Sequence, residues 1–255
     1  MIWLMDGIIS VKNLVKNYDQ VAAVDDISFQ VQEGEIFGLL GPNGAGKTTT
    51  LEMIETLRQP TSGLITIDGI DAAQNPQEIK RRIGIQLQSS GFYPGLNLVE
   101  LLEMFAIMYG VTVDPAKMLE EFQLKDKAKA FYDKMSGGQK QRFSLCTTLI
   151  NQPRIIFLDE PTTGLDPQAR VNLWGVIQEI KKKGVTVVIT THYMDEAEQL
   201  CDRLAIMDHG KIISEGTPVE LIDQLLKSGF QRHTEVRAAT LEDVFLNLTG
   251  RRIRE

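Results

Sequence analysis

Apolar residues follow two different periods along this chain, and the change of period divides it into regions. Alternation over Ile8 to Val15 and over Ile27 to Val31 predicts strands of a small antiparallel sheet near the N-terminus. The apolar run from Glu35 to Leu40 predicts a buried strand, and Thr48 to Leu57 predicts the helix that follows it. Leu64 to Gly69 predicts an edge strand that ends in a turn.

Helical periodicity replaces this pattern between about residues 89 and 150. Its first apolar face has the i, i+3, i+4, i+7 spacing and consists of Leu98, Leu101, Leu102 and Phe105. Afterwards strands predicted at Ile155–Leu158, Val185–Thr190 and Leu204–Met207 alternate with helices predicted near Pro167–Lys183 and Met194–Cys201. Such alternation predicts a mostly parallel sheet covered by helices, so the helical segment is an insertion in an α/β core.

The C-terminal residues differ in character from the rest. Lys227 to Ala239 is polar with little period and predicts a linker. The next segment predicts a capped amphipathic helix whose apolar face is Leu241, Val244, Phe245 and Leu248. That face packs either on a dimer partner or on its own domain, and both alternatives stay open. We therefore expect one unit over residues 1–225 and a C-terminal extension over 226–255.

Composition narrows the class of protein. Hydrophobic residues are 43% and charged residues 24%, which is ordinary for a globular protein, and the net charge of −7 argues against a nucleic-acid partner. The longest charge-free run, Ile83 to Val99, contains too many polar residues and glycines for a membrane span of about 18 apolar residues. The first residues predict no signal peptide. Cys146 and Cys201 lack metal-site spacing, so we expect buried, reduced thiols in the cytosol.

A glycine-rich loop follows the predicted buried strand and opens a helix. It consists of Gly41, Pro42, Asn43, Gly44, Ala45, Gly46, Lys47 and Thr48, with Thr49 next. In such a loop the backbone N–H groups and the positive end of the helix dipole converge on phosphate oxygens. Lys47 would add a charge at the terminal phosphates, and the Thr48 hydroxyl would ligate Mg²⁺.

Two carboxylates end the predicted strand Ile155–Leu158. Ligands of open parallel sheets bind at the carboxyl ends of the strands. We predict that Asp159 holds the metal and that Glu160 polarises the attacking water, a role worth about 10²–10⁴-fold in rate. A carboxylate pair that only caps a loop is the structural alternative, which the Lys47 motif disfavours.

A second helix start of unusual composition consists of Met135, Ser136, Gly137, Gly138 and Gln139. Ser136 is a good N-cap, and the two glycines expose backbone donors at the positive end of a helix. The predicted chemistry is a second anion site that contains no lysine. Taken alone, the same residues are a capped helix with a flexible start.

With these motifs in order, the chain resembles an ABC-type ATPase, the nucleotide-binding subunit of an ABC transporter, from about Ile8 to Leu225. Ser136 to Gln139 match the signature of that family, with Met135 where leucine is commonest. Gln88 matches its glutamine loop and by resemblance takes part in metal binding and catalysis. Gln86, two residues earlier, leaves the register of that loop open.

Three further positions follow from the resemblance. Asp166, in the segment Gly164 to Pro167, matches the aspartate loop of the family, and His192 matches its catalytic switch histidine. His192 follows a run of Val, Ile and Thr, which favours contact with the γ-phosphate. Tyr18 matches the aromatic residue that stacks on adenine, although a strand-end aromatic is the simpler alternative. His209 is expected in a hairpin turn without a functional role.

The resemblance implies a P-loop NTPase core with a mostly parallel sheet, an N-terminal antiparallel β subdomain and an inserted helical subdomain. It implies ATP and Mg²⁺ as cofactors. It also implies a second ATP-binding subunit, identical or paralogous, which closes head to tail so that the Ser136 loop of one copy contacts the γ-phosphate held by Lys47 of the other.

The resemblance further implies a separate transmembrane permease and a peripheral location on the inner, cytoplasmic face of the cell membrane. Phe92 to Leu96 lie where the family contacts its membrane subunit, or they pack within the helical insertion. Leu241 to Arg251 resemble the endings of ATP subunits of ABC-2 type exporters. The expected function is therefore to energise an exporter by ATP-driven dimerisation.

The alternative is a soluble ABC ATPase that acts on ribosomes or DNA. Such relatives carry paired cassettes, zinc modules or long coiled coils, for which this sequence offers no pattern. A regulatory module without turnover conflicts with the presence of Glu160. The transported substance is chosen by another polypeptide and is not encoded in this chain.

Overall fold

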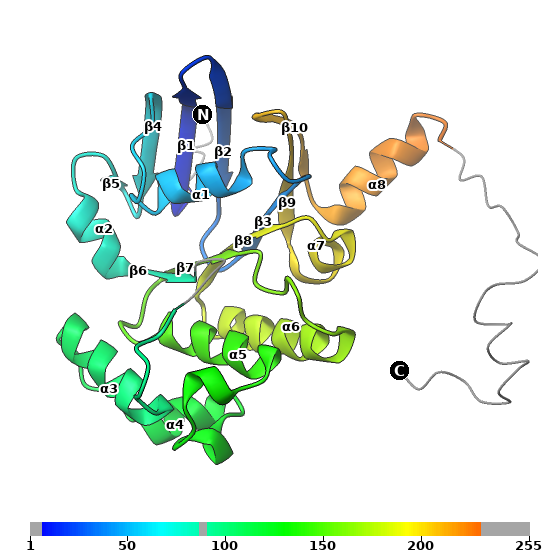
Figure 1. Ribbon diagram of the computed structural model, residues 1–255. Helices are drawn as coiled ribbons and strands as arrows, with labels where there is room; N and C mark the ends of the chain where they lie inside the picture. Colours follow the sequence, from blue (N-terminus) through cyan, green and yellow to red (C-terminus); the bar gives the residue numbers. More distant parts are fainter. Residues whose placement is uncertain (1–6, 87–90, 231–255) are drawn as a thin grey trace, which may run out of the picture. The chain divides into compact units, whose positions relative to one another are not determined.

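The computed structural model describes residues 7–86 and 91–230 (Figure 1). The chain divides into two compact units, Met1–Leu221 and Ile222–Glu255, which are described separately. Gln88 and the predicted helix Thr240 to Leu248 lie outside the described residues, as does most of the predicted linker.

An antiparallel sheet of four strands lies in the first unit, with the order β2-β1-β4-β5. Its strands are β1 (Ile9–Tyr18), β2 (Val21–Val31), β4 (Ser62–Ile67) and β5 (Ile70–Asp71). This confirms the N-terminal antiparallel sheet. The prediction that β4 forms the edge is wrong, because the chain turns at Asp68 and Gly69 and pairs Ile70 with Ile67. Two residues are too short a strand for a periodic pattern to reveal.

A second sheet of six strands has the order β10-β9-β3-β8-β7-β6. Its strands are β3 (Ile36–Leu40), β6 (Ile83–Gln86), β7 (Ile155–Asp159), β8 (Thr186–Thr191), β9 (Arg203–Asp208) and β10 (Lys211–Gly216). All neighbours are parallel except β9 and β10, which a hairpin at His209 and Gly210 joins. The parallel α/β core and the hairpin are thus confirmed.

The helices within the described residues follow the expected order. They are α1 (Lys47–Ile54), α2 (Pro76–Arg82), α3 (Leu98–Tyr109), α4 (Pro115–Glu121), α5 (Gly137–Thr147), α6 (Pro167–Lys182), α7 (Met194–Leu200) and α8 (Pro218–Lys227), with short 3₁₀ turns η1 (Lys125–Lys127) and η2 (Tyr132–Lys134). The segment α3 to α5 forms the inserted helical block. Helix α2 was not expected, because Ile79 is its only buried residue and gives no period.

The central strands β3, β7 and β8 of the six-stranded sheet are buried on both faces, and their successive residues point to opposite sides. Phe37 and Leu39 of β3 pack in a core with the antiparallel sheet and α1, whereas Ile36 and Leu40 pack in a core with α3, α5 and α6. Figure 1 shows α1 and α5 on opposite sides of this sheet. Each fully buried large side chain contributes roughly 1.5–3 kcal/mol. Because both faces of these strands are covered, the strand ends are the part of the sheet that remains open to a ligand.

Over residues 7–86 and 91–230, every helix is too short or too polar to cross a bilayer. Cys146 and Cys201 are both buried free thiols, as expected. Burial raises the pKa of each thiol above its ordinary value. They therefore contribute to packing rather than to chemistry.

Candidate functional site

The glycine-rich loop connects β3 to α1 and is fixed by its packing against neighbouring strands. The N–H of Gly41 donates to the carbonyl of Thr191 at 3.3 Å. A Cβ atom on Gly41 would lie 2.3 Å from the carbonyl oxygen of Met207, and one on Gly46 would lie 2.5 Å from that of Ala23. Gly46 also has a φ of 101°, which favours glycine. These two positions therefore require glycine for reasons of packing.

Lys47 is the first residue of α1, and its ammonium group folds back over the loop. Its side chain is 4% exposed, and Nζ donates to the carbonyls of Gly41 at 2.9 Å and Pro42 at 3.1 Å. The third oxygen neighbour is Oε1 of Glu160, at 3.4 Å. A buried charge needs such partners. The cation is thus held at the mouth of the loop, as expected for a group that faces terminal phosphates.

The Thr48 hydroxyl and the Asp159 carboxylate lie together at the end of β7. Oγ1 of Thr48 is 3.3 and 3.2 Å from the two oxygens of Asp159, and Oγ1 of Thr190 also donates to Asp159. Burial raises the pKa of Asp159, and the hydrogen bonds from Thr190 and Thr48 oppose this rise. A hydroxyl and a carboxylate are hard oxygen donors, so the residues present fit Mg²⁺, which binds few protein groups alongside phosphates and water.

Glu160 follows Asp159 and has an unusual backbone conformation, with φ of 47°. Its N–H donates to the carbonyl and to the hydroxyl of Thr190, at 3.1 and 3.0 Å. Its Oε1 lies 3.2 Å from Nδ1 of His192, the residue directly after β8. A left-handed non-glycine residue costs of order 1–3 kcal/mol and persists where its surroundings fix it. The structure therefore brings Lys47, Glu160 and His192 to one edge of the sheet.

Ser136 to Gln139 form the start of α5, at a different place. Ser136 is the N-cap and Gln139 completes a capping box, with the Gln139 N–H donating to Ser136 Oγ at 3.4 Å and the Ser136 N–H donating to Gln139 Oε1 at 3.0 Å. Gly138 faces α6, and a Cβ there would lie 3.0 Å from that of Ala169. Among the described residues, no hydrogen bond or ion pair joins this loop to Lys47. Lys47 begins α1 and Ser136 caps α5, and Figure 1 shows these two helices on opposite sides of the six-stranded sheet.

Asp166 and Tyr18 also lie apart from Lys47. Asp166 is the N-cap of α6, and its Oδ1 accepts from the N–H of Ala169 at 2.8 Å. Tyr18 ends β1 and is 39% exposed, and the cationic groups of Lys16 and Arg58 lie 5.3 and 5.4 Å from the centre of its ring. An aromatic ring that is partly exposed is of the kind that can stack on a planar group. Its proposed contact with adenine stays a prediction.

The glutamine loop is described only as far as Gln86. The side chain of Gln86 is buried on β6, and its Nε2 donates to Oε1 of Gln141 at 2.6 Å. Gln86 is therefore committed to α5, which favours the register in which Gln88 is the functional residue. Gln88 itself lies outside the described residues, and its role stays a prediction.

Phe92 and Tyr93, the aromatic pair after this loop, differ in their surroundings. The sequence left open whether this segment contacts a membrane subunit or packs within the helical insertion. Phe92 packs within the helical insertion, with ring centres 4.4 Å from Tyr132 and 5.1 Å from Phe143. Tyr93 is 66% exposed. Core packing therefore accounts for Phe92, while Tyr93 is available to a partner.

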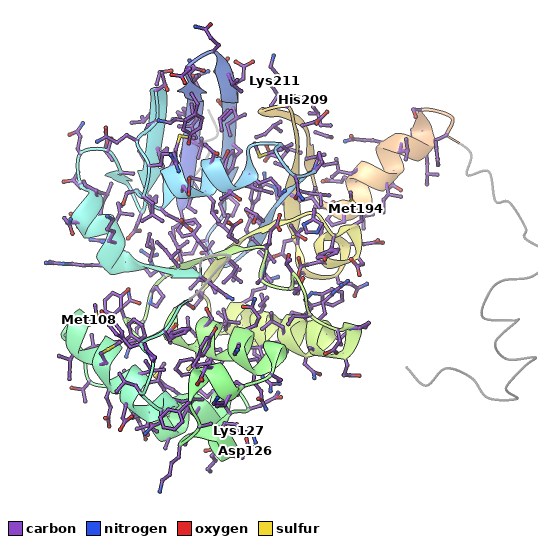
Figure 2. The ribbon with its side chains drawn as sticks, viewed as in Figure 1. Met108, Asp126, Lys127, Met194, His209 and Lys211 are labelled. Carbon is purple, nitrogen blue, oxygen red and sulfur yellow. The ribbon has the colours of Figure 1, made fainter. Side chains whose placement is uncertain are left out.

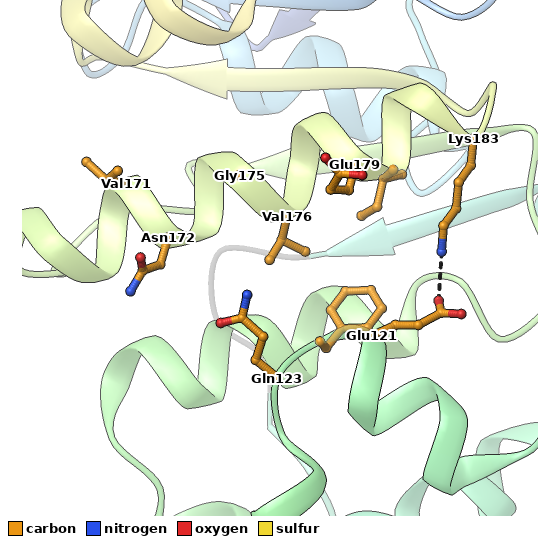
Figure 3. A pocket seen from close by; sticks show the side chains of 10 residues that line it. Glu121, Gln123, Val171, Asn172, Gly175, Val176, Glu179 and Lys183 are labelled. Carbon is orange, nitrogen blue, oxygen red and sulfur yellow. Dashed lines mark hydrogen bonds and ion pairs between the residues drawn. The ribbon is translucent and has the colours of Figure 1, made fainter.

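A hollow of about 250 Å³ lies between α4 and α6, away from the glycine-rich loop (Figure 3). Val171 and Val176 line it from α6, and Gln123 lines it from the segment after α4. An ion pair of 2.7 Å between Lys183 and Glu121 crosses one end. None of the phosphate-directed residues lines it, so we assign it no part in the chemistry.

Sequence reasoning missed Thr190, which donates to the Asp159 carboxylate and accepts from the Glu160 backbone N–H, and the residues around His192. A threonine within a strand gives no signal of its own, because only the pairing of β7 with β8 places Thr190 opposite Asp159. His209 is 96% exposed at the β9–β10 hairpin, where Figure 2 labels it beside Lys211. This agrees with a turn residue.

Comparison with known proteins adds independent evidence. A family model described as ABC transporter matches residues 24–163. The Nod factor export ATP-binding protein I of Burkholderia orbicola is 36% identical, over 97% of this chain and 98% of that protein. The probable multidrug ABC transporter ATP-binding protein YbhF of Escherichia coli is 39% identical, over 95% of this chain and 42% of that protein.

Solved structures give the same result. The ATP-binding subunit of an ABC transporter superposes with a TM-score of 0.75 at 31% identity, covering 94% of this chain and 99% of that one. A dimeric ATP-binding cassette in a post-hydrolysis state, bound to ADP and Pi, superposes with a TM-score of 0.74 at 27% identity, covering 82% of this chain and 98% of that one. The fold is therefore shared with these proteins.

Proposed function

The chain belongs to the ABC transporter family and is an ATP-binding, ATP-hydrolysing subunit, and from this premise we propose that it drives an exporter through a separate membrane permease. One observation carries the catalytic part of the proposal. Lys47, Glu160 and His192 meet at the carboxyl edge of the sheet, with Glu160 Oε1 3.4 Å from the lysine and 3.2 Å from the histidine. Ligands of open parallel sheets bind at this edge, which supports the proposal that this cation and this carboxylate act on the terminal phosphate and its attacking water.

We assign each group a separate role in this reaction. The N–H groups of Gly41 to Thr49 and the Lys47 ammonium would hold the phosphates, and Tyr18 would stack on the adenine. Thr48, Asp159 and Gln88 would hold Mg²⁺, which supplies charge neutralisation on the phosphates when bound. Glu160 accepts the proton of the attacking water, and His192 donates a hydrogen bond to the γ-phosphate.

The separation of the Ser136 loop from Lys47 supports a site completed by a second subunit. In a head-to-tail dimer, Ser136 to Gln139 of one copy would face the γ-phosphate held by the other copy, with Asp166 beside the interface. The related cassette solved as a dimer with ADP and Pi supports such an arrangement. Loss of the bridging phosphate on hydrolysis would weaken the closed state, because its binding energy is no longer shared by both halves. The second subunit is another copy or a paralogue.

The proposal that the transporter is an exporter rests on the names of the related proteins. One is named for Nod factor export and one as a probable multidrug transporter component, which favours an exporter over a soluble ATPase that acts on ribosomes or DNA. Tyr93 is 66% exposed and is the proposed contact for the permease. The subunit would then lie on the cytoplasmic face of the membrane.

The Glu160→Gln variant of the full chain tests the catalytic assignment. We expect it to bind Mg-ATP with nearly the affinity of the wild type, because Gln preserves the shape of the side chain. Turnover should fall by at least about 10²-fold, since the proton acceptor is lost. A dimer should accumulate on size-exclusion chromatography with Mg-ATP.

Glu103→Gln makes the same chemical change on an exposed position of α3 and serves as the matched control. Normal turnover by Glu160→Gln would refute the assignment of the proton acceptor. If turnover is lost but no dimer accumulates, the assignment of Glu160 as the proton acceptor stands. The proposed closure of two subunits around the triphosphate is then contradicted.

A further inference from the structure

Helix α6 and the start of α7 are joined by stacked side chains next to His192. The ring of Tyr193 packs against the imidazole of His192, with centroids 4.1 Å apart and planes inclined by 38°. The guanidinium carbon of Arg170 lies 4.4 Å from the centre of the same tyrosine ring. Arg170, Tyr193 and His192 thus form a continuous stack that ends at Glu160, 3.2 Å from the imidazole.

Hydrogen bonds from backbone N–H groups fix the two segments that carry Tyr193 and Arg170. The Tyr193 N–H donates to Thr191 Oγ1 at 3.0 Å, which fixes the turn after β8. Arg170 lies one turn into α6, and its N–H donates to the carbonyl of Asp166 at 3.0 Å. The orientation of the His192 ring is therefore tied to the helix that begins at Asp166.

A second contact prevents α7 from shifting along α6. Nε1 of Trp174 donates to Oε1 of Glu196 at 3.0 Å, and Glu196 is fully buried. At the surface, Nη1 of Arg170 donates to Asp195 at 3.0 Å, where the aspartate is 56% exposed. The buried bond supplies rigidity, whereas the exposed ion pair adds little. Arg170 is thus placed mainly by its helix and by the tyrosine face.

We propose that Arg170 and Tyr193 are positioning residues that hold the His192 imidazole in the orientation needed for turnover. The inference rests on the proposed role of His192 at the γ-phosphate. An imidazole can rotate about two side-chain bonds, and its bond to a phosphate oxygen depends on direction as well as distance. Packing against the Tyr193 ring restricts this freedom, and the Arg170 cation over the same tyrosine helps to hold that ring in place.

The kinetic test compares Tyr193→Ala and Arg170→Met with the wild type, using the full chain and Mg-ATP. A misplacement of about 1 Å in a catalytic group can lower the rate by about 10²-fold, so we expect kcat to fall by at least about tenfold in both variants. The KM and the affinity for a fluorescent ATP analogue should stay within about twofold, because the phosphate loop is untouched. Tyr193→Phe retains the ring and should restore turnover.

Asp195→Asn is the matched control, since it removes the exposed ion pair and leaves the stack intact. Its turnover should equal that of the wild type. The inference is overturned if Tyr193→Ala turns over normally while His192→Ala does not, or if melting temperature, nucleotide affinity and rate fall together. Normal turnover by His192→Ala would instead refute the proposed role of His192 itself.

A spectroscopic readout reports the ring orientation directly. The chain contains three histidines, so the imidazole signals of a protein labelled at histidine are few. Arg170→Met should shift the Cε1–H signal of His192, because the tyrosine ring current at that proton changes. The signal of His209, which is 96% exposed at the distant hairpin, should not move. If the His192 signal does not change, the contacts with Tyr193 and Arg170 do not determine the orientation of the imidazole, and the inference is contradicted.

Discussion

A buried carboxyl group at the end of α1 makes the stability of this protein depend on pH. Glu55 is 1% exposed, and its Oε1 has no hydrogen-bond partner among the described residues. Burial raises the pKa of Glu55 to about 8, and the negative charges of Asp159 and Glu52 add to the rise. The folded protein therefore keeps Glu55 protonated at pH values at which the unfolded chain ionises it.

The sign and size of the effect follow from proton linkage. The pKa is higher in the folded state, so the stabilising contribution is complete below the ordinary value of 4.5 and is lost as the pH rises to about 8. At about 1.4 kcal/mol for each pH unit, this interval corresponds to a loss of up to about 5 kcal/mol in the free energy of unfolding. Above that range the contribution stays constant.

Glu55→Gln removes the ionisation and retains the size of the side chain. We expect the variant to gain stability relative to the wild type as the pH rises, whatever its constant offset. Urea unfolding followed by tryptophan fluorescence, at about pH 5.5, 7 and 8.5, measures this difference. Glu103→Gln makes the same chemical change at an exposed position of α3, is the control, and should leave the pH dependence of stability unchanged. Parallel pH profiles of Glu55→Gln and the wild type would refute the reasoning.

Three further outcomes are expected. Ser136→Arg should leave the nucleotide affinity of the isolated subunit nearly intact and abolish hydrolysis, because Ser136 lies away from its own phosphate loop; a parallel loss of affinity and rate would contradict the role in trans. Gly38→Ala should lower stability by about 1–3 kcal/mol in thermal melts, since its Cβ would lie 2.6 Å from Sγ of Cys201, whereas Gly175→Ala, in open space on α6, should raise it by up to about 1 kcal/mol. Lys183→Met should change stability by less than about 1 kcal/mol in urea unfolding, because the ion pair that it breaks is exposed.

The parts of the fold that could be predicted are those with strong local patterns. Strands β3 and β7 are runs of mainly apolar residues, β8 is a run of Val, Ile and Thr, and helix α5 begins at a serine cap. Helix α2 and strand β5 gave no such signal, because the first buries only Ile79 and the second has two residues. The interior place of β4 depends on β5 and was missed for that reason.

The candidate site divides in the same way. Lys47, Asp159 and Glu160 could be predicted from the sequence, because each belongs to a motif contained within one loop or one strand end. The hydrogen bonds of Thr190 and the stack on Tyr193 arise between segments far apart in sequence, and they exist only once β7 lies beside β8 and α6 beside α7. Hydrophobic periodicity predicts local helices and strands, but it does not predict which of these segments come into contact.

The packing of the phosphate loop changes how genetic screens of this protein should be interpreted. An inactive allele at Gly41 or Gly46 reports a steric collision with the carbonyl of Met207 or Ala23, and so it says nothing about nucleotide recognition. Gly44 has a φ of 83°, and a Cβ there would meet open space. Asparagine tolerates this conformation better than other side chains. Gly44→Asn is therefore more informative than alleles at Gly41 or Gly46, because it adds no steric collision and asparagine strains the backbone least among the other residues.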